Sequence, residues 1–456
     1  MSCAACCEST VDLNSAILNA ETMKRIFPLI CLLGSLAPRL SCPAAEPPTW
    51  NADESKVAPY TLPDPLRGDD GIRVKDAAAW QSRRRGEILR SFSTLMYGVT
   101  PQPPLQLRAE VTARRTDAVQ GLATRTLVTL RFFDDPAAPC IHLMLYVPNA
   151  TTKPAPVFLG LNYRGNACVE SDPAIPLTER WVLGRPPGNG IVNNRATGAT
   201  RGSCAAAWPL ALALHRGYAV ATFFYGDIEE DHGDGWRNGI RGYLMRKEGR
   251  TAAKPDEWGA LGAWGWGLSR ALDYLETNPA VDARRVAVFG HSRHGKAALW
   301  AGAQDERFAL VISNNSGEGG ASLARRDFGE TIANSIEWAW YRYCDRFRGF
   351  AGRAADLPFD QHMLLALVAP RPVYVASATE DHLADPRGEF LSAVHAAPVY
   401  RLLGHSGLGA AEMPPPDRSI GDRIGYHIRT GRHAIVEFDW EQYLNFADRH
   451  FQPSKP

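Results

Sequence analysis

Seven short runs of apolar and β-branched residues follow one another along the chain, each separated from the next by a loop or a helix-like segment. They cover residues 124–133, 141–147, 157–162, 218–225, 286–290, 310–313 and 373–376. Runs of this length and composition predict β-strands. The last four are almost continuously hydrophobic, which is typical of parallel strands that are covered on both faces.

Two segments carry the pattern of amphipathic helices. Residues 257–277 place large apolar side chains at spacings of three and four, which predicts a helix with one buried stripe. Residues 440–451 predict a second helix near the C-terminus. Trp258, Trp264 and Trp266 in the first helix have an alternative role as a sugar platform, but packing on a sheet favours their interpretation as core residues.

The order of these elements indicates the fold class. Strands in hairpin-like succession, followed by strands alternating with helices, predict an α/β protein of the α/β-hydrolase kind, a three-layer sandwich with a central, mostly parallel sheet. We expect a single catalytic domain over residues 50–453. The irregular stretches 164–208 and 227–255 are long for a compact domain, so they are candidate rims or lids over a site.

The overall charge changes this picture little. Lys plus Arg is 50 and Asp plus Glu is 49, so the net charge of +1 provides no general field that would attract nucleic acid or an anionic membrane.

The N-terminal region predicts export. Residues 23–45 combine a basic start, a short apolar run and small residues, as in a signal peptide, and the run is too short for a permanent membrane span. We expect residues 1–22 to precede the true start or to be disordered, with a metal site at their cysteines as the alternative. Cys42 leaves a lipoprotein anchor open, although Arg39 does not fit that motif.

The cysteines that remain after the predicted leader is removed could form a disulfide across a loop. Cys140, Cys168, Cys204 and Cys344 follow residue 45, and an oxidising compartment permits disulfides. Because Cys168 and Cys204 bracket a segment rich in Gly, Pro and Asn, they are the preferred pair, although sequence cannot establish the pairing.

The clearest chemical signal is the stretch "VAVFGHSRHGKAALW" at residues 286–300. A serine at a sharp turn between a strand and a helix presents its hydroxyl at the edge of the sheet, and nearby glycines leave room for the backbone. Ser292 is therefore the candidate nucleophile. The pattern is G-x-S-x-x-G, with Gly295 three residues after the serine, and it departs from the common G-x-S-x-G.

A serine hydroxyl needs a base, and the base needs an orienting acid. In this fold the chain order is serine, acid, histidine. His433, just before the C-terminal helix, is the candidate base, with His405 and His427 as rivals. Asp381, the first aspartate after the strand at 373–376, is the candidate acid, whereas Asp385 is expected to cap the next turn.

Two basic residues follow the serine. The backbone N–H of Arg293 is the standard donor to the oxygen that becomes negative during ester cleavage, and its side chain adds a positive charge. The alternative for Arg293 is a pair with a surface carboxylate. Lys296 lies in the first helical turn, where a cation opposes the helix dipole, which suggests a role in holding a polyhydroxylated ligand.

These residues resemble the glucuronoyl esterases of carbohydrate esterase family 15. "GHSRHGKAALW" is similar to the family signature G-x-S-R-x-G-K, and the resemblance extends from about Thr152 to the C-terminus through "WGWGLSRALDYLE", "NNSGEGGASLARRDFGE", "EDHLADPRGEF" and "GYHIRTGRH". The resemblance implies an α/β-hydrolase that uses no cofactor. It also implies cleavage of the ester between a 4-O-methyl-glucuronate group of xylan and a lignin alcohol.

Carried over by motif, the resemblance implies Ser292 as nucleophile, His433 as base and Arg293 as stabiliser of the oxyanion. Lys296, Glu330 and Trp338 match positions that hold the uronate ring. An ammonium and a carboxylate can bind hydroxyls, and an aromatic face suits the apolar side of a sugar. Without the resemblance, Glu330 would be interpreted as an acid on a helix surface and Trp338 as a core aromatic.

The sequence departs from the family pattern at two positions. Many members carry the acid as a glutamate where this chain has Asn315, so the other family arrangement, with Asp381 as the acid, is expected here. Glu318 is the reserve candidate. Leu383 replaces a frequent tryptophan, which weakens one wall of the expected pocket.

Two other functions stay open at this point. One is an acetyl or feruloyl esterase of the same fold, and the other is a carbohydrate-binding relative without catalytic activity. The apparently complete set of Ser, Asp and His favours an enzyme.

Overall fold

A computed structural model describes residues 50–103, 105–184 and 188–451. The expected leader at 23–45, the segment 1–22 and Cys42 lie outside the described residues. Within the described ranges, no helix combines the length and the hydrophobicity that crossing a bilayer requires.

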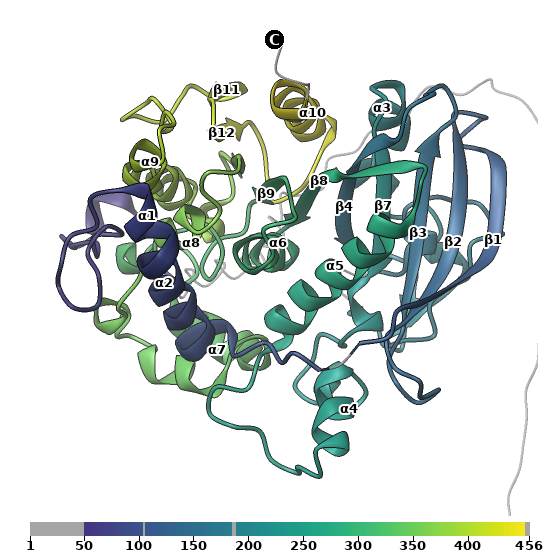
Figure 1. The fold of residues 1–456 in the computed structure, drawn as a ribbon, viewed down its shortest axis with the longest axis horizontal. Helices are drawn as coiled ribbons and strands as arrows, with labels where there is room; N and C mark the ends of the chain where they lie inside the picture. The colour runs from purple at the N-terminus through teal and green to yellow at the C-terminus, as the bar shows by residue number, and fades with distance from the viewer. Residues whose placement is uncertain (1–49, 104, 185–187, 452–456) are drawn as a thin grey trace, which may run out of the picture. The chain divides into compact units, whose positions relative to one another are not determined.

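A ten-stranded sheet forms the centre of the described domain, with the order β1-β2-β3-β7-β4-β8-β9-β10-β12-β11 (Figure 1). The pairs from β7 to β12 are parallel, and the pairs at both edges are antiparallel. The strands are β1 Arg108–Ala118, β2 Ala123–Arg131, β3 Ile141–Pro148, β4 Ala155–Asn162, β7 Ala219–Phe224, β8 Val281–His291, β9 Leu310–Asn314, β10 Val373–Ala378, β11 Arg418–Gly421 and β12 Ile424–Arg429. The short strands β5 Ile191–Val192 and β6 Arg195–Ala196 form a separate hairpin.

Residues of α5 and α6 pack in the cluster on one face of this sheet, and residues of α3 and α10 pack in the cluster on the other. The described helices are α1 Ala77–Ala79, α2 Arg85–Phe92, α3 Leu210–His215, α4 Ile240–Lys247, α5 Ala260–Thr277, α6 Arg293–Gln304, α7 Ile332–Ala339, α8 Gln361–Ala366, α9 Pro386–Leu402 and α10 Glu437–Phe451. Figure 1 shows α5 and α6 running beside β8. This arrangement confirms the predicted α/β-hydrolase fold with its three layers.

The alternation of side chains along the central strands divides the core in two. Val157 and Leu159 of β4 pack in one apolar cluster with residues of α5 and α6, whereas Phe158 packs in a second cluster with α3 and α10. Successive side chains of a strand point to opposite faces, so a buried strand needs apolar residues at nearly every position.

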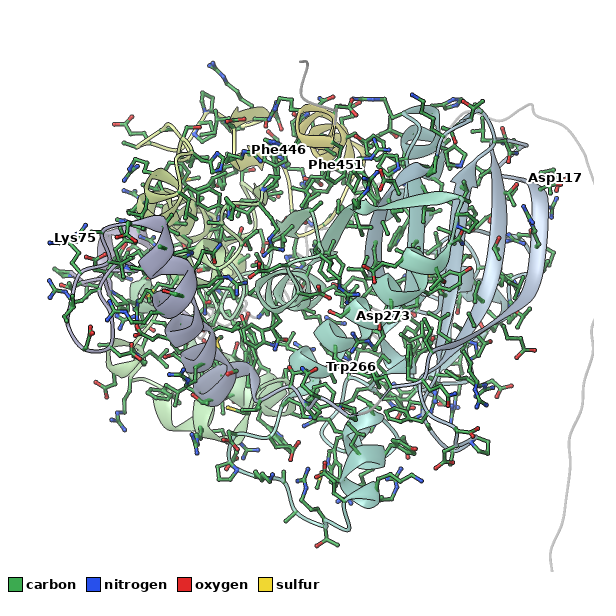
Figure 2. The ribbon with its side chains drawn as sticks, in the orientation of Figure 1. Lys75, Asp117, Trp266, Asp273, Phe446 and Phe451 are labelled. Carbon is green, nitrogen blue, oxygen red and sulfur yellow. The ribbon has the colours of Figure 1, made fainter. Side chains whose placement is uncertain are left out.

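Most of the predicted elements are found within a few residues of their expected bounds. All seven predicted strands are present, and the predicted helices appear as α5 and α10. Figure 2 labels Trp266 on α5 and Phe446 and Phe451 on α10. Trp258, Trp264 and Trp266 are at most 3% exposed, which confirms that they belong to the core.

The two irregular stretches contain more structure than expected. The segment 164–208 holds the β5–β6 hairpin and short 3-10 turns, and the segment 227–255 contains α4. Cys168 and Cys204 are brought together by a hydrogen bond of 2.7 Å from the Cys204 N–H to the Cys168 carbonyl. Both are free thiols in the structure, so the preferred disulfide is not formed there.

A buried carboxylate fastens α10 to the sheet. Asp439 accepts hydrogen bonds from His427 Nε2 at 2.9 Å, from Arg429 Nε at 3.0 Å and from the backbone N–H of Val436 at 2.8 Å. Arg429 in turn donates from Nη2 to the carbonyls of Arg432 and Ala434. The loop around residue 433 is therefore held from both sides by a charged network with no solvent access to Asp439.

Asp439→Asn should destabilise the fold strongly, because it leaves the buried Arg429 guanidinium without its counter-charge. Breaking such a pair costs about 3–5 kcal/mol. Urea unfolding checks this value, with Glu441→Gln on the exposed face of α10 as the control. An unfolding free energy for Asp439→Asn equal to that of the control would contradict the role of the network.

Candidate active site

The chain reverses sharply between β8 and α6. Ser292 is the single residue between them, and its φ of 56° lies in the left-handed region that residues with a side chain seldom adopt. The Ser292 N–H donates to the Asn314 carbonyl at 2.8 Å, which ties the turn to the end of β9. A Cβ on Gly290 would collide with the backbone of His294, so the turn requires glycine there. This geometry matches a nucleophile elbow.

His433 and Asp381 are joined by a short hydrogen bond. His433 Nδ1 lies 2.6 Å from Asp381 Oδ2. A carboxylate only accepts, so the proton is on Nδ1 and the lone pair of Nε2 is available as a base. The Asp381 side chain is 4% exposed and the His433 side chain is 42% exposed, so the acid is buried and the imidazole faces solvent.

Asn315 completes this pair. It is held in the left-handed region with a φ of 46°, and its Nδ2 donates to Asp381 Oδ2 at 2.7 Å. The same carboxylate oxygen therefore accepts from both the imidazole and the amide. Asn315 thus supports the orientation of Asp381.

His433 lies beside the elbow. Its ring packs against that of His291, the residue before Ser292, with the ring centroids 4.4 Å apart. Among the described residues, no hydrogen bond joins the Ser292 hydroxyl to His433. In enzymes of this kind, that bond often tightens only when substrate is bound.

Arg293 extends from the first turn of α6 over two aromatic rings. Its guanidinium carbon is 4.7 Å from the centre of the Tyr163 ring and 5.8 Å from that of Tyr225. Nε lies 2.8 Å from the carboxylate of Asp231. The carboxylate partner expected as the alternative is thus present, but it is a fully buried one at the elbow and not a surface residue.

Lys296 and Glu330 form a buried ion pair. Lys296 Nζ donates to Glu330 Oε2 at 3.0 Å, and Ser335 donates to Oε1 at 2.8 Å. Burial would lower the pKa of Lys296, but the Glu330 carboxylate outweighs burial and raises it, so the ammonium stays charged. With 15% of its side chain exposed, Glu330 is not the surface acid that its sequence alone suggested.

Trp338 lies apart from this ion pair. It is near the end of α7, whereas Glu330 precedes the N-cap of that helix. It is 45% exposed and packs edge-on against Trp50, with the ring centroids 6.2 Å apart. The interpretation of Trp338 as a core aromatic is therefore wrong.

The rival residues have other roles in the structure. His427 is buried against Asp439 and Tyr374. His405 lines a pocket with residues 281–285, which belong to the start of β8, whereas Ser292 follows the end of this strand. Asp385 caps α9 by accepting from the Gly388 N–H at 2.9 Å, which confirms the expected cap.

Glu318, the reserve acid, is buried, with 1% of its surface exposed. Burial raises the pKa of its carboxyl well above the usual value, with a further contribution from Asp360, and Lys296 opposes the rise. The structure brings Asp381, not Glu318, into contact with His433.

Sequence reasoning missed Tyr163, Tyr225, Asp231 and Arg342 at this site. Tyr163 and Tyr225 directly follow β4 and β7, so the rule that sites form at the carboxyl ends of parallel strands would have identified them. Asp231 comes from an irregular segment after β7 and Arg342 from the 3-10 helix Trp340–Arg342, and neither carries such a signal.

Within the described ranges, no group of three His, Cys, Asp or Glu side chains is arranged to hold a metal ion. The hydrogen-bonded pair of Asp381 and His433 lies beside His291, the residue before Ser292. The central sheet, with its strand-to-helix turn at a serine, defines the chain as an α/β-hydrolase.

Comparisons with known proteins identify the family. A family model described as glucuronyl esterase of fungi matches residues 207–404. The carbohydrate esterase MZ0003, from an unknown prokaryotic organism, is 45% identical over 406 residues, which are 89% of this chain and 93% of that protein. A 4-O-methyl-glucuronoyl methylesterase of Phanerochaete carnosa is 28% identical and covers 83% of this chain and 77% of its own length.

The structure is similar to that of a glucuronoyl esterase from Solibacter usitatus. The TM-score is 0.82 at 45% identity, covering 87% of this chain and all of the other. The chain belongs to the glucuronoyl esterase family, carbohydrate esterase family 15, and is a carboxylic ester hydrolase.

Asp381→Asn should slow turnover by orders of magnitude with little change in folding. Losing the orienting carboxylate of a related triad lowers kcat about 10⁴-fold. Steady-state kinetics on a glucuronate ester check this, with Glu318→Gln as the matched control. A larger loss in Glu318→Gln than in Asp381→Asn would show that the acid is assigned to the wrong residue.

Proposed function

We propose that this protein is a serine esterase that cleaves the ester between a (4-O-methyl-)glucuronate side group of xylan and a lignin alcohol. The observation that carries the proposal is the hydrogen-bonded pair of His433 and Asp381 beside the strained turn at Ser292. The side chain of Arg293 next to the serine supplies a positive charge.

The proposed reaction has two halves. The Ser292 hydroxyl attacks the ester carbonyl while His433 Nε2 takes its proton, and the carbonyl oxygen becomes negative. His433 then gives this proton to the leaving alcohol, which leaves the uronyl group esterified to Ser292. A water molecule then attacks this acyl-enzyme while His433 takes its proton. His433 returns the proton to Ser292 Oγ as the bond from Oγ to the uronyl group breaks, which releases the uronic acid and the free serine.

Arg293 acts on the negative oxygen. Its backbone N–H is at the start of α6, and such a donor is worth about 2.7–4 kcal/mol in a comparable site. Burial would lower the pKa of the guanidinium, but Asp231 outweighs it and raises the pKa, so Arg293 is charged at every relevant pH.

Lys296 and Glu330 are proposed to bind the sugar. Together they offer ammonium donors and carboxylate acceptors within a buried pair, which suits the hydroxyls of a uronate ring. Trp338, exposed near the end of α7, is proposed to contact an apolar part of the substrate. The name of the fungal relative, a 4-O-methyl-glucuronoyl methylesterase, agrees with this substrate class.

Substrate selectivity and the nucleophile can be tested together. The purified protein should hydrolyse methyl, allyl and benzyl glucuronates faster than p-nitrophenyl acetate, because an acetyl group cannot use Lys296 and Glu330. Ser292→Ala should abolish hydrolysis, while Ser82→Ala, at an exposed position far along the chain, should match the unaltered protein. Retained turnover by Ser292→Ala would refute the nucleophile, and faster cleavage of acetylated or feruloylated xylan would favour the alternative esterase.

Export is the last part of the proposal. A signal peptide at residues 23–45 predicts that the exported protein begins close to residue 46. Intact-mass measurement of the protein recovered from outside the cytoplasm checks this. Recovery of an exported chain that still carries residues 23–45 would contradict it.

A further inference from the structure

A buried carboxylate joins two arginines at the edge of the site. Asp231, with a side chain that has no solvent exposure, lies 2.8 Å from Arg293 Nε through Oδ2. Arg342 donates from Nε to Oδ1 and from Nη2 to Oδ2, both at 2.8 Å. Tyr341 adds a hydroxyl hydrogen bond to Oδ1 at 2.9 Å. Asp231 therefore connects the residue after Ser292 to a distant segment of the chain.

This connection engages only one side of the Arg293 guanidinium. The contact to Asp231 involves Nε, and no described residue accepts a hydrogen bond from either Nη group of Arg293. The rings of Tyr163 and Tyr225 restrict the guanidinium further. The Nε side of the group is thus held by the charge of Asp231 and by packing on the two rings, without a hydrogen bond from Nε, and the terminal N–H groups have no described acceptor.

The charges in this cluster do not cancel. Two guanidiniums share one carboxylate, so the group of Asp231, Arg293 and Arg342 carries a net charge of +1. Lys296, by contrast, is paired with Glu330. The positive excess beside Ser292 therefore depends on Arg342, since Arg293 and Asp231 alone would be neutral.

The carboxylate keeps its charge in spite of its burial. Burial by itself would raise the pKa of Asp231, but Arg342 and then Arg293 outweigh burial and hold the pKa well below its usual value. The cluster consequently stays ionised across the pH range in which an esterase works.

We propose that Asp231 and Arg342 are positioning residues for the oxyanion. Asp231 fixes the Arg293 guanidinium beside Ser292 before substrate arrives, and Arg342 keeps the cluster positive so that Arg293 can accept the charge of the carbonyl oxygen. The inference rests on the proposed function, because it assumes ester cleavage at Ser292. Donors that are fixed in advance stabilise a transition state without reorganising during the reaction.

This role has a kinetic signature. The oxyanion exists only in the transition state, so losing its support should lower kcat and leave KM nearly unchanged. Removing one oxyanion donor lowers kcat about 10²–10³-fold. Asp231→Asn, which misplaces the donor, should lower kcat by about 10- to 100-fold.

A double-mutant cycle on benzyl glucuronate separates positioning from general support of the fold. If Asp231 acts through Arg293, the kcat of the variant carrying both Asp231→Asn and Arg293→Ala should lie within about twofold of Arg293→Ala alone. Independent, multiplying losses would overturn the inference. Arg342→Lys, which retains the charge, should keep a higher kcat than Arg342→Gln, and equal values would also overturn it.

The neighbouring ion pair provides a matched control. Glu229, two residues before Asp231, is fully buried and binds the Arg241 guanidinium through both carboxylate oxygens. Glu229→Gln should lower the melting temperature without changing kcat. A loss of kcat equal to that of Asp231→Asn would show that any loosening of this segment slows the enzyme, against the inference.

Folding of the variants is checked by thermal melts. Should Asp231→Asn fail to fold, the double variant Asp231→Asn/Arg342→Gln removes one charge of each sign and preserves the net charge, and it should show the same loss of kcat. If the unaltered protein does not hydrolyse glucuronate esters, the proposed function is refuted. If Arg293→Ala inactivates the protein but a folded Asp231 variant has normal activity, the inference is refuted and the proposed function still stands.

Discussion

The reversal of the backbone at Ser292 is the constraint on which the rest of the site depends. A residue with a side chain occupies the left-handed region there, and it does so because β8 and α6 are both held by packing on the central sheet. Gly290 gives the turn the room that it needs. The strain places a hydroxyl and the first N–H of a helix at the same point, and these are the two groups that acyl transfer requires.

The parallel part of the sheet brings the remaining groups to this point. Because neighbouring parallel strands end at one edge, the segments that follow β4, β7, β9, β10 and β12 all reach the surroundings of Ser292. The residues that they supply are Tyr163, Tyr225, Asn315, Asp381 and His433. The buried Lys296 is paired with Glu330, whereas the cluster of Asp231, Arg293 and Arg342 contains two guanidiniums and one carboxylate.

The sequence predicted seven strands of the sheet because a strand depends on a local pattern, and the same kind of local pattern led to the candidate site residues. Continuous apolar runs mark strands that are covered on both faces, and Ser292 and Asp381 follow two of them. In contrast, β1, β11 and β12 were not predicted. The residues of β1 are exposed at nearly every position and carry no apolar run, and β12 is buried but contains His427 and Arg429. The exposure of Trp338 and the role of Asn315 depend on packing between distant segments, which a single sequence does not reveal.

The central claim is that the hydroxyl of Ser292, activated by His433, is the nucleophile. Labelling of the purified protein with a fluorophosphonate, followed by peptide mass mapping, tests it most directly. The account predicts a single adduct on Ser292 that His433→Ala prevents from forming. An adduct on another residue, or equal labelling of Ser292 in the absence of the imidazole, would contradict it.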